Sequence, residues 1–178
     1  MSIDDLPIMR DPIHLRCLEL ASEAKSGSGF GAVLEVTYAD GSGRTIGRTC
    51  EGRNMRKRPG RYASGGYCEH AENVVLNDAL DYAEENGLSI AAARMYIGGI
   101  VAGAPYVRKE AKHTCLICAN QIRKSLPENA EILLALSEGW ASLSPEDAYE
   151  TALTVAREKR EKKKSADELR RENSVLAS

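Results

Sequence analysis

Apolar residues recur at helical spacing in several stretches of the chain, and each stretch has the end signals of a helix. Asp11-Pro12 offers an N-cap and a proline suited to the first helical position, which predicts a helix of about 12 to 15 residues. Cys68–Glu85 carries a continuous apolar stripe and stops at Asn86-Gly87. A shorter helix is predicted at Cys115–Lys124, and a last one begins at Ser144-Pro145.

Between the predicted helices lie short runs rich in β-branched and aromatic residues. Gly31–Tyr38 and Thr45–Gly52 flank the turn residues Asp40-Gly41-Ser42-Gly43, and they predict a hairpin. Arg94–Val101 predicts a third strand, and we expect Ile90–Ala93 to continue the turn before it. The hairpin therefore precedes the long central helix, and the third strand follows it.

The C-terminal half continues with a polar insertion at Gly103–His113 and a fourth strand at Ala130–Leu136. Trp140–Leu143 is too short to indicate a fifth strand. Arg157–Lys164 has no apolar face, so this run is either a solvated helix or a disordered tail. A length of 178 residues suits one domain with a terminal extension, which we place at residues 1–143 and 144–178.

The composition is that of a globular protein with few aromatic residues. Apolar residues make up 43% of the chain and charged residues 28%, which argues against wholesale disorder. The core must rest on Leu, Ile, Val and Ala, because the chain has one Phe and one Trp. A formal net charge of -2 argues against a protein whose whole surface binds a polyanion.

The N-terminus and the cysteines favour a cytoplasmic protein. Residues 1–6 lack the basic and apolar segments of a secretory signal, and no apolar stretch is long enough to span a membrane. We therefore expect no membrane partner. The five cysteines are an odd number at irregular spacing, which favours reduced thiols, some of them metal ligands, over a disulfide framework.

Two short motifs supply the ligands of a zinc site. His70 and Glu72 lie at the start of the long central helix, and Cys115 and Cys118 lie at the start of the next one. Imidazole and thiolate both suit zinc, which keeps three protein ligands and an open position when it is catalytic. Glu72 lies two residues past His70, so its carboxylate can stand beside the metal and transfer protons without binding it.

Other interpretations of the cysteines remain open at this point. Cys-x-x-Cys in a cytosolic protein is also typical of a redox pair, which usually follows a strand directly. A closed structural zinc site would need a fourth ligand, for which Cys68 and His113 are candidates. Cys68 would point away from His70 on a helix, so a buried or incidental thiol is the preferred interpretation. His113 suits a helix cap, a substrate contact or a solvent-exposed position equally, and His14, near the apolar side of the first helix, is interpreted as structural.

These motifs resemble the zinc-dependent cytidine and deoxycytidylate deaminase superfamily over roughly residues 10 to 140. The matching segments occur in the family's order, and the helix after the thiolate pair is nearest to the nucleotide-acting branch. They are Gly31-Ala32-Val33, Gly52-Arg53-Asn54, His70-Ala71-Glu72, Cys115-Leu116-Ile117-Cys118 and Gln121-Ile122. The resemblance implies an α/β fold, a three-layer α/β/α sandwich with a central mixed sheet of four to five strands. It also implies a homo-oligomer.

The same resemblance implies a chemistry and a set of site residues. Zinc held by His70, Cys115 and Cys118 would activate water for attack on C4 of a cytosine-type base, and Glu72 would shuttle protons to the ring and to departing ammonia. Asn54, Ala71 and Thr114 would contact the substrate. Thr114 stands where the family usually has proline, and the segment before Cys115 is longer than in a compact member.

The substrate is suggested by a basic loop between Asn54 and the zinc motif. Its cations are Arg53, Arg56, Lys57, Arg58 and Arg61. They suit a phosphate, with Arg56 and Arg58 as candidate contacts, so a nucleotide such as dCMP or CMP is favoured over a nucleoside. A solvated loop that only balances nearby acidic residues is the alternative.

Two further functions remain possible from the sequence. A deaminase acting on a flipped base in single-stranded DNA, RNA or tRNA would use Arg108, Lys109, Lys112 and the basic C-terminal run to bind the nucleic acid. The scarcity of aromatic residues and the negative net charge argue against it. A zinc-stabilised interaction module without catalysis is the third option, and for it Glu72 would be dispensable.

Overall fold

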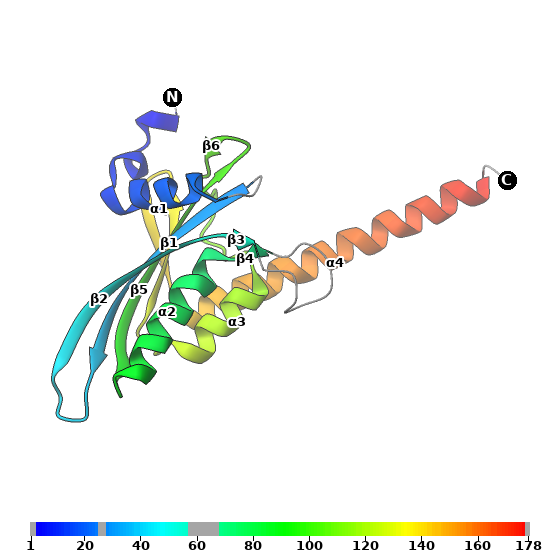
Figure 1. Cartoon of the computed structure of the whole chain (residues 1–178). Coiled ribbons are helices and arrows are strands. Elements are labelled where there is room, and N and C mark those ends of the chain that lie inside the picture. Colours follow the sequence, from blue (N-terminus) through cyan, green and yellow to red (C-terminus); the bar gives the residue numbers. More distant parts are fainter. Residues whose placement is uncertain (1–2, 25–27, 57–67, 177–178) are drawn as a thin grey trace.

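The structure is a computed structural model of the chain, and it describes residues 3–24, 28–56 and 68–176, with the side chains of Asp4, Ser28, Arg56, Cys68 and residues 168–176 excepted (Figure 1). Two short 3₁₀ turns, Ile3–Asp5 and Pro7–Arg10, precede the first helix. The α-helices are α1 (Pro12–Ser22), α2 (Ala71–Glu85), α3 (Leu116–Ser125) and α4 (Pro145–Leu176). Each begins within three residues of its predicted start.

The helix caps are those expected from the sequence. Asp11 accepts hydrogen bonds from the backbone N–H groups of Ile13 and His14 at the start of α1. At the start of α4, Ser144 accepts one from the N–H of Asp147 and donates one to its carboxylate. Both caps satisfy N–H groups that the helix itself leaves without partners. These local rules explain why the starts of α1 and α4 were predictable.

A mixed sheet forms the centre of the molecule. Its main strands are β1 (Ser28–Ala39), β2 (Thr45–Arg53), β5 (Ser89–Val101), β7 (Glu131–Leu136) and β8 (Gly139–Leu143). The spatial order is β2-β1-β5-β7-β8; β5 and β7 are parallel, and the other neighbours are antiparallel. Short β6 (Ala104–Pro105) pairs with β5, while β3 (Met55–Arg56) and β4 (Cys68–Glu69) form a separate ribbon. The predicted α/β class with a mixed sheet is confirmed.

Three expectations about element boundaries are wrong. Trp140–Leu143 belongs to a real strand, β8, because five residue pairs join it to β7 across a tight hairpin. Ile90–Ala93 extends β5, since the whole length of β1 is available as a partner. Cys68 lies in β4 and not in α2, which starts only after His70.

The larger core fills the space between the sheet and α2. Leu34, Val36 and Met95 point from the strands toward Val75 and Leu76 of the helix, and all five side chains are buried. Gly52 permits a close approach, because a Cβ there would lie 2.9 Å from side-chain atoms of Val74 and Val75. This packing holds the N-terminus of α2 against the end of β2.

The opposite face of the sheet is covered by α1 over part of its length (Figure 1). Cys17 and Leu20 pack there against Val33, Tyr96 and Leu133. A Cβ at Gly31 would lie 2.2 Å from the carbonyl oxygen of Cys17, so this helix sits almost on the backbone of β1. With α1 on one face and α2 and α3 on the other, the fold is a three-layer sandwich.

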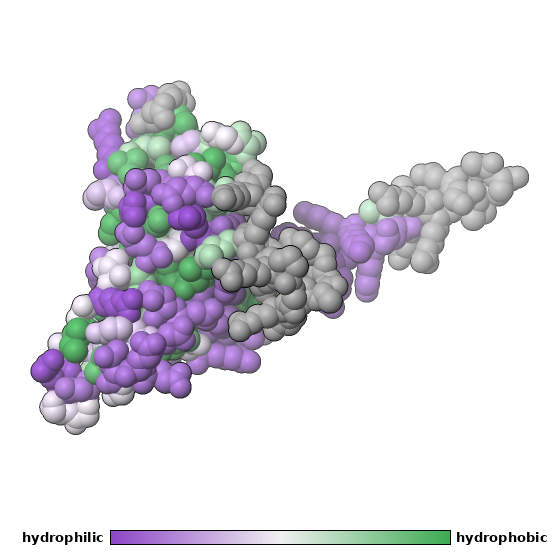
Figure 2. All heavy atoms as spheres, in the orientation of Figure 1, coloured by the Kyte–Doolittle hydropathy of each residue, from purple (hydrophilic) through white to green (hydrophobic). Residues whose placement is uncertain are grey.

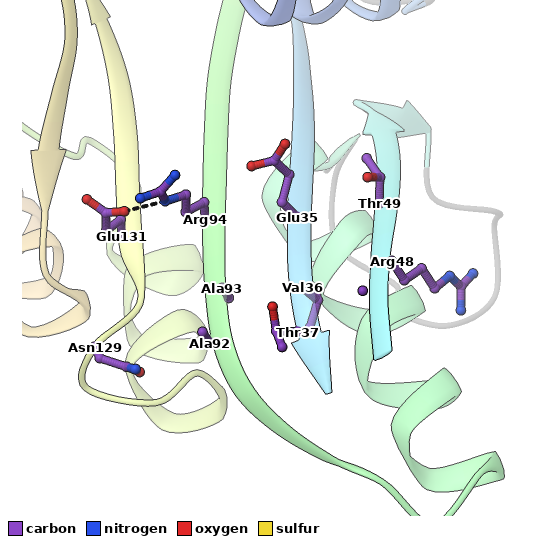
Figure 3. Close-up of a pocket in the computed structure, with 11 residues that line it drawn as sticks. Glu35, Val36, Thr37, Arg48, Thr49, Ala92, Ala93, Arg94, Asn129 and Glu131 are labelled. Atoms are coloured by element: carbon purple, nitrogen blue, oxygen red, sulfur yellow. Dashed lines mark hydrogen bonds and ion pairs between the residues drawn. The ribbon is translucent and has the colours of Figure 1, made fainter. Parts of the chain in front are cut away.

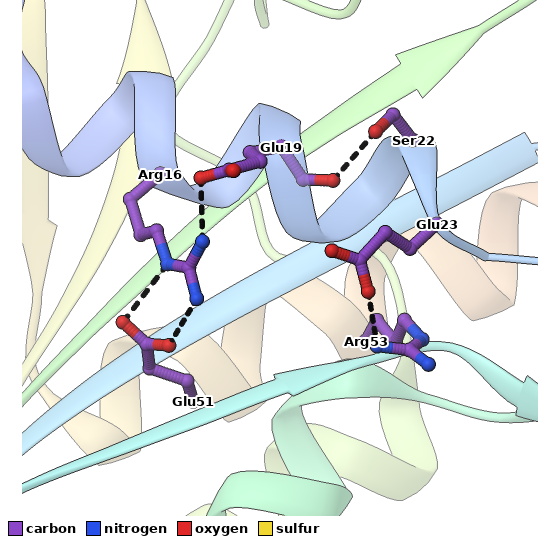
Figure 4. A network of polar contacts seen from close by, with 6 residues as sticks. All are labelled: Arg16, Glu19, Ser22, Glu23, Glu51 and Arg53. Atoms are coloured by element: carbon purple, nitrogen blue, oxygen red, sulfur yellow. Dashed lines mark hydrogen bonds and ion pairs between the residues drawn. The ribbon is translucent and has the colours of Figure 1, made fainter.

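Ion pairs join α1 to the edge strand β2 (Figure 4). Arg16 binds the carboxylates of Glu19 and Glu51, and Arg53 pairs with Glu23 just beyond the helix. Glu51 and Arg53 both face α1 because side chains alternate between the two faces of a strand. These pairs are largely exposed, so they orient side chains more than they stabilise the fold.

The first turns of α4 pack on the domain, and the rest of the helix extends away from it (Figure 1). Ala148 and Ala152 are buried, whereas residues 157–167 are all exposed. The exposed part is strongly hydrophilic in Figure 2. The charged run Arg157–Lys164 is therefore a solvated helix. Within the described ranges, no helix combines the length and apolar character needed to cross a membrane.

Candidate metal and catalytic site

The N-terminus of α2 carries the first half of the site. His70 is the N-cap residue in extended conformation, and Glu72 lies in the first helical turn. Asn54, which follows β2, accepts a hydrogen bond from the backbone N–H of Ala71 at 3.1 Å. The amide oxygen thereby takes the capping role that the His70 side chain leaves open. Asn54 thus ties the end of β2 to the turn that presents His70 and Glu72.

The N-terminus of α3 carries the second half. Cys115 is its N-cap, and its sulfur accepts a hydrogen bond from the N–H of Cys118 at 3.5 Å. Backbone N–H groups and the positive end of the helix dipole favour thiolate at this position. The Cys-x-x-Cys spacing places both sulfur atoms on the side of α3 that faces α2.

His70, Cys115 and Cys118 meet although up to 48 residues separate them in the chain. One ligand atom from each lies within 4.8 Å of the other two, and Nδ1 of His70 is 3.2 Å from Sγ of Cys118. The cluster therefore has a donor set that could hold a metal ion. One imidazole and two thiolates match the preference of zinc, and three ligands leave a fourth position for water or substrate.

The two thiols shift each other's pKa in opposite directions. The hydrogen bond from Cys118 lowers the pKa of Cys115, with a further contribution from His70. The same hydrogen bond, together with burial, raises the pKa of Cys118. The shift at Cys115 favours the thiolate, which is the form of cysteine that binds metal. Both thiols are free, as a metal-binding role requires.

Glu72 lies beside this cluster and is 7% exposed. One of its titratable neighbours is His113, whose Nε2 is 3.6 Å from Oε1 of Glu72. His113 is 1% exposed, and burial lowers its pKa, although the charge of Glu72 opposes that shift. The ring of His113 therefore contacts Glu72 and the Cys115 backbone, and it does not join the three clustered ligand atoms.

His70, Glu72 and Cys115 face a cavity of about 240 Å³. Its lining residues are Phe30, Asn54, His70, Glu72, Arg108, Thr114 and Cys115. The cavity brings together most of the predicted site residues and adds two that the motifs did not indicate, Phe30 and Arg108. Phe30 contacts Tyr106 edge to face, and the Arg108 guanidinium lies 5.5 Å from the centre of the Tyr106 ring.

Arg108 is the one cation among those lining residues. Its Nη1 donates to the carbonyl oxygen of Lys112, and no carboxylate in the described part of the chain forms an ion pair with it. Burial lowers the pKa of its guanidinium, while Tyr106 and Glu72 favour the charged form. The sequence indicated Arg108 only as one of the cations of the polar insertion that could bind a nucleic acid.

The predicted substrate contacts have mixed outcomes. Asn54 and Thr114 line the cavity, whereas Ala71 is fully buried and offers its N–H to Asn54. Arg53 belongs to β2, not to a basic loop at the cavity, and it pairs with Glu23 on the other face of the sheet. Arg58 and the side chain of Arg56 lie outside the described residues, as do Lys57 and Arg61.

A larger cavity of about 610 Å³ lies on the α1 side of the sheet (Figure 3). It is bordered by polar strand residues that already have partners: Arg94 binds Glu131, and Glu35 accepts a hydrogen bond from the hydroxyl of Tyr96. Within the described ranges, the one group of clustered metal-ligand atoms, His70, Cys115 and Cys118, lies outside this cavity. The smaller cavity is therefore the candidate site.

Comparisons with protein-family models and with curated proteins find no match for this chain. The functional assignment rests accordingly on the residues of the cavity and their geometry.

Proposed function

We propose that the protein is a zinc-dependent hydrolytic deaminase that acts on a cytosine-type nucleotide of the dCMP or CMP class. The observation that carries this proposal is the position of the Glu72 carboxylate in the same cavity as the His70, Cys115 and Cys118 cluster. A structural zinc site needs four protein ligands and no free carboxylate. A hydrolytic site needs three ligands, an open position and a proton carrier, which is what these residues supply.

Each residue has a role that follows from its chemistry. His70, Cys115 and Cys118 would hold zinc, which when bound supplies Lewis-acid activation of water for attack on the carbon bearing the amino group. Glu72 would accept one proton from the attacking water and pass it to the ring nitrogen. It would then accept the proton of the new hydroxyl group and pass it to the amino group, which leaves as ammonia. In the net reaction, the oxygen atom of water replaces the amino group on the ring carbon as a carbonyl, and ammonia is released. Glu72 is buried, so bulk water has little access to its carboxylate.

The preference for an anionic substrate is supported by Arg108. A half-buried guanidinium without an ion pair is unfavourable unless a ligand anion binds it, and its fork of donors suits a phosphate. The cavity volume of about 240 Å³ suits a base with part of its sugar, so a phosphate would lie toward the mouth. Phe30 and the exposed Tyr106 offer aromatic surface beside it.

Release of ammonia by the zinc-loaded protein tests the proposal. The substrates should include cytidine, dCMP, CMP, single-stranded DNA, RNA and guanine-type bases. We expect dCMP or CMP to be the best substrate. Turnover only on polynucleotides would favour the flipped-base alternative, and no ammonia from any of them despite bound zinc would favour the interaction module.

The variant Arg108→Gln tests the anion contact. Loss of a charge-assisted hydrogen bond costs about 1.5 to 3 kcal/mol, so KM for the nucleotide should rise by about 10- to 100-fold. KM for the matching nucleoside should stay unchanged. Lys109→Gln, at the exposed neighbouring position, is the matched control. Equal effects of Arg108→Gln on nucleotide and nucleoside would reject the phosphate contact.

A further inference from the structure

We propose that His113 is a positioning residue that holds the Glu72 carboxylate by donating its Nε2–H to Oε1. The inference rests on the proposed function, which gives Glu72 the proton transfer, and it assigns a role to a histidine that the zinc motif does not include. Its basis is the set of contacts that fix the ring of His113 on both sides.

The first contact fixes the tautomer. Nδ1 of His113 accepts a hydrogen bond from the backbone N–H of Cys115 at 3.3 Å. A ring nitrogen that accepts cannot carry a proton, so the proton of the neutral ring resides on Nε2. The nitrogen that faces Glu72 is therefore the donor.

The second contact is with Glu72. Nε2 lies 3.6 Å from Oε1, and the side chains of His113 and Glu72 are 1% and 9% exposed. In the described part of the chain Nε2 has no other hydrogen-bond partner, and a buried donor without one is costly. A shift of a few tenths of an ångström closes the distance to a hydrogen bond, as is common when a site takes up its ligands.

The third contact anchors the residue from outside the site. The backbone N–H of His113 donates to Oγ1 of Thr151 in α4 at 3.2 Å, and the Thr151 hydroxyl donates in turn to the carbonyl of Ala148. The first turns of α4 thus fix the backbone from which the ring reaches both Cys115 and Glu72. His113 connects the turn that bears the thiolates, the carboxylate and the C-terminal helix.

Two conservative variants distinguish the contribution of the Nδ1 contact from that of the Nε2 contact. In His113→Asn the amide oxygen reproduces Nδ1 and keeps the Cys115 contact, but nothing reaches Glu72. In His113→Gln the longer amide reproduces Nε2 and loses the Cys115 contact. Groups that orient catalytic residues typically contribute about 10- to 100-fold. We expect His113→Asn to lower kcat by that factor with unchanged KM and zinc content, and His113→Gln to retain most of kcat.

If His113→Asn kept its kcat and His113→Gln lost it, the proposal would be overturned, because activity would then depend on the contact with Cys115 and not on the contact with Glu72. Equal losses accompanied by loss of zinc would also overturn it, since His113 would then only support the metal site.

A spectroscopic measurement tests the contact without activity. The chain has three histidines, so a long-range proton–nitrogen spectrum of histidine-labelled, zinc-loaded protein is simple to assign. We expect His113 to show a protonated Nε2 and an unprotonated Nδ1, and Glu72→Gln to move the Nε2–H proton upfield while His14 stays unchanged. A protonated Nδ1, or no shift in Glu72→Gln, would refute the inference. If the wild-type protein releases no ammonia, the proposed function fails while this spectrum still decides the contact.

Discussion

Two buried histidines lie on opposite sides of the sheet, and their surroundings differ. His14 of α1 is 0% exposed, and neither ring nitrogen has a hydrogen-bond partner among the residues that the structure describes. It packs edge to face against Trp140, 5.6 Å between ring centres. His113 is buried to nearly the same extent, but its ring nitrogens face the N–H of Cys115 and the carboxylate of Glu72.

Burial and a lowered pKa do not by themselves mark a functional histidine. Burial is the largest cause of the lowered pKa for both residues. The distinction lies in the partners: one ring is enclosed by aromatic and apolar atoms, and the other joins groups that bear chemistry. We therefore expect variants on the His113 side to change catalytic activity or metal binding, and variants on the His14 side to change only stability.

The largest effect is expected for Glu72→Gln. Loss of a group that transfers protons typically lowers the rate by about 100- to 10,000-fold. Zinc content should stay unchanged, because Glu72 is not one of the three clustered ligands. Ammonia release and metal analysis provide the two measurements. Glu84→Gln, an exposed position on the same helix, is the control. Full turnover by Glu72→Gln would contradict the proton-transfer role.

The next largest effect is a loss of zinc affinity, and it is expected for only one of two buried cysteines that lie on opposite sides of the sheet. Cys118→Ser removes a ligand, so zinc affinity should fall by more than the roughly 10- to 100-fold typical of outer-shell changes. Cys17→Ser should leave zinc binding intact. Burial raises the pKa of Cys17 to about 12, which makes it an inert thiol under α1. Titration with a zinc chelator measures the zinc affinity of both variants. Equal zinc loss in the two would contradict the assignment of Cys118, and not Cys17, as a zinc ligand.

A smaller effect is expected where α1 touches β1. A Cβ at Gly31 would lie 2.2 Å from the Cys17 carbonyl oxygen and 2.8 Å from Cβ of Leu20. Gly31→Ala should therefore lower the free energy of unfolding by about 1 to 3 kcal/mol or more, measured by denaturant titration. Gly41→Ala, in open space at the hairpin turn, is the control. Folded Gly31→Ala protein should still bind zinc. Loss of zinc would show that packing of α1 on one face of the sheet affects the metal site on the other face.

The smallest effect is the pH dependence from His14. Burial lowers its folded pKa below the ordinary value of 6.5, so the unfolded chain binds more protons below that pH. The stability contributed by neutral His14 is complete above pH 6.5 and is lost as the pH falls below it, by at most about 1.4 kcal/mol per pH unit. His14→Phe removes this contribution. Denaturation of both proteins between pH 7.5 and 5.5 should show the wild type losing stability relative to the variant, and a constant difference would contradict this expectation.

The elements that the sequence predicted well are those specified by local rules. Asp11 and Ser144 cap helices through side-chain bonds to residues two or three positions away, and the apolar stripe of α2 follows its own period. β8 was missed because a five-residue strand depends on its partner β7 more than on its own composition. The same reason explains the underestimated length of β5, whose extension pairs with β1.

The functional site also has some features that local sequence specifies and others that depend on distant parts of the chain. His70 and Glu72 share one helix start and Cys115 and Cys118 another, so the sequence alone determined each half of the cluster and the donor atoms that it offers to a metal. Only the tertiary structure decided that the halves meet within 4.8 Å, that Arg108 enters the cavity while Arg53 points to α1, and that His113 faces Glu72. Ligand type and capping depend on neighbours a few residues away. The residues that contact a buried charged side chain depend on how strands and helices that are distant in the chain pack together. No local sequence pattern encodes that packing.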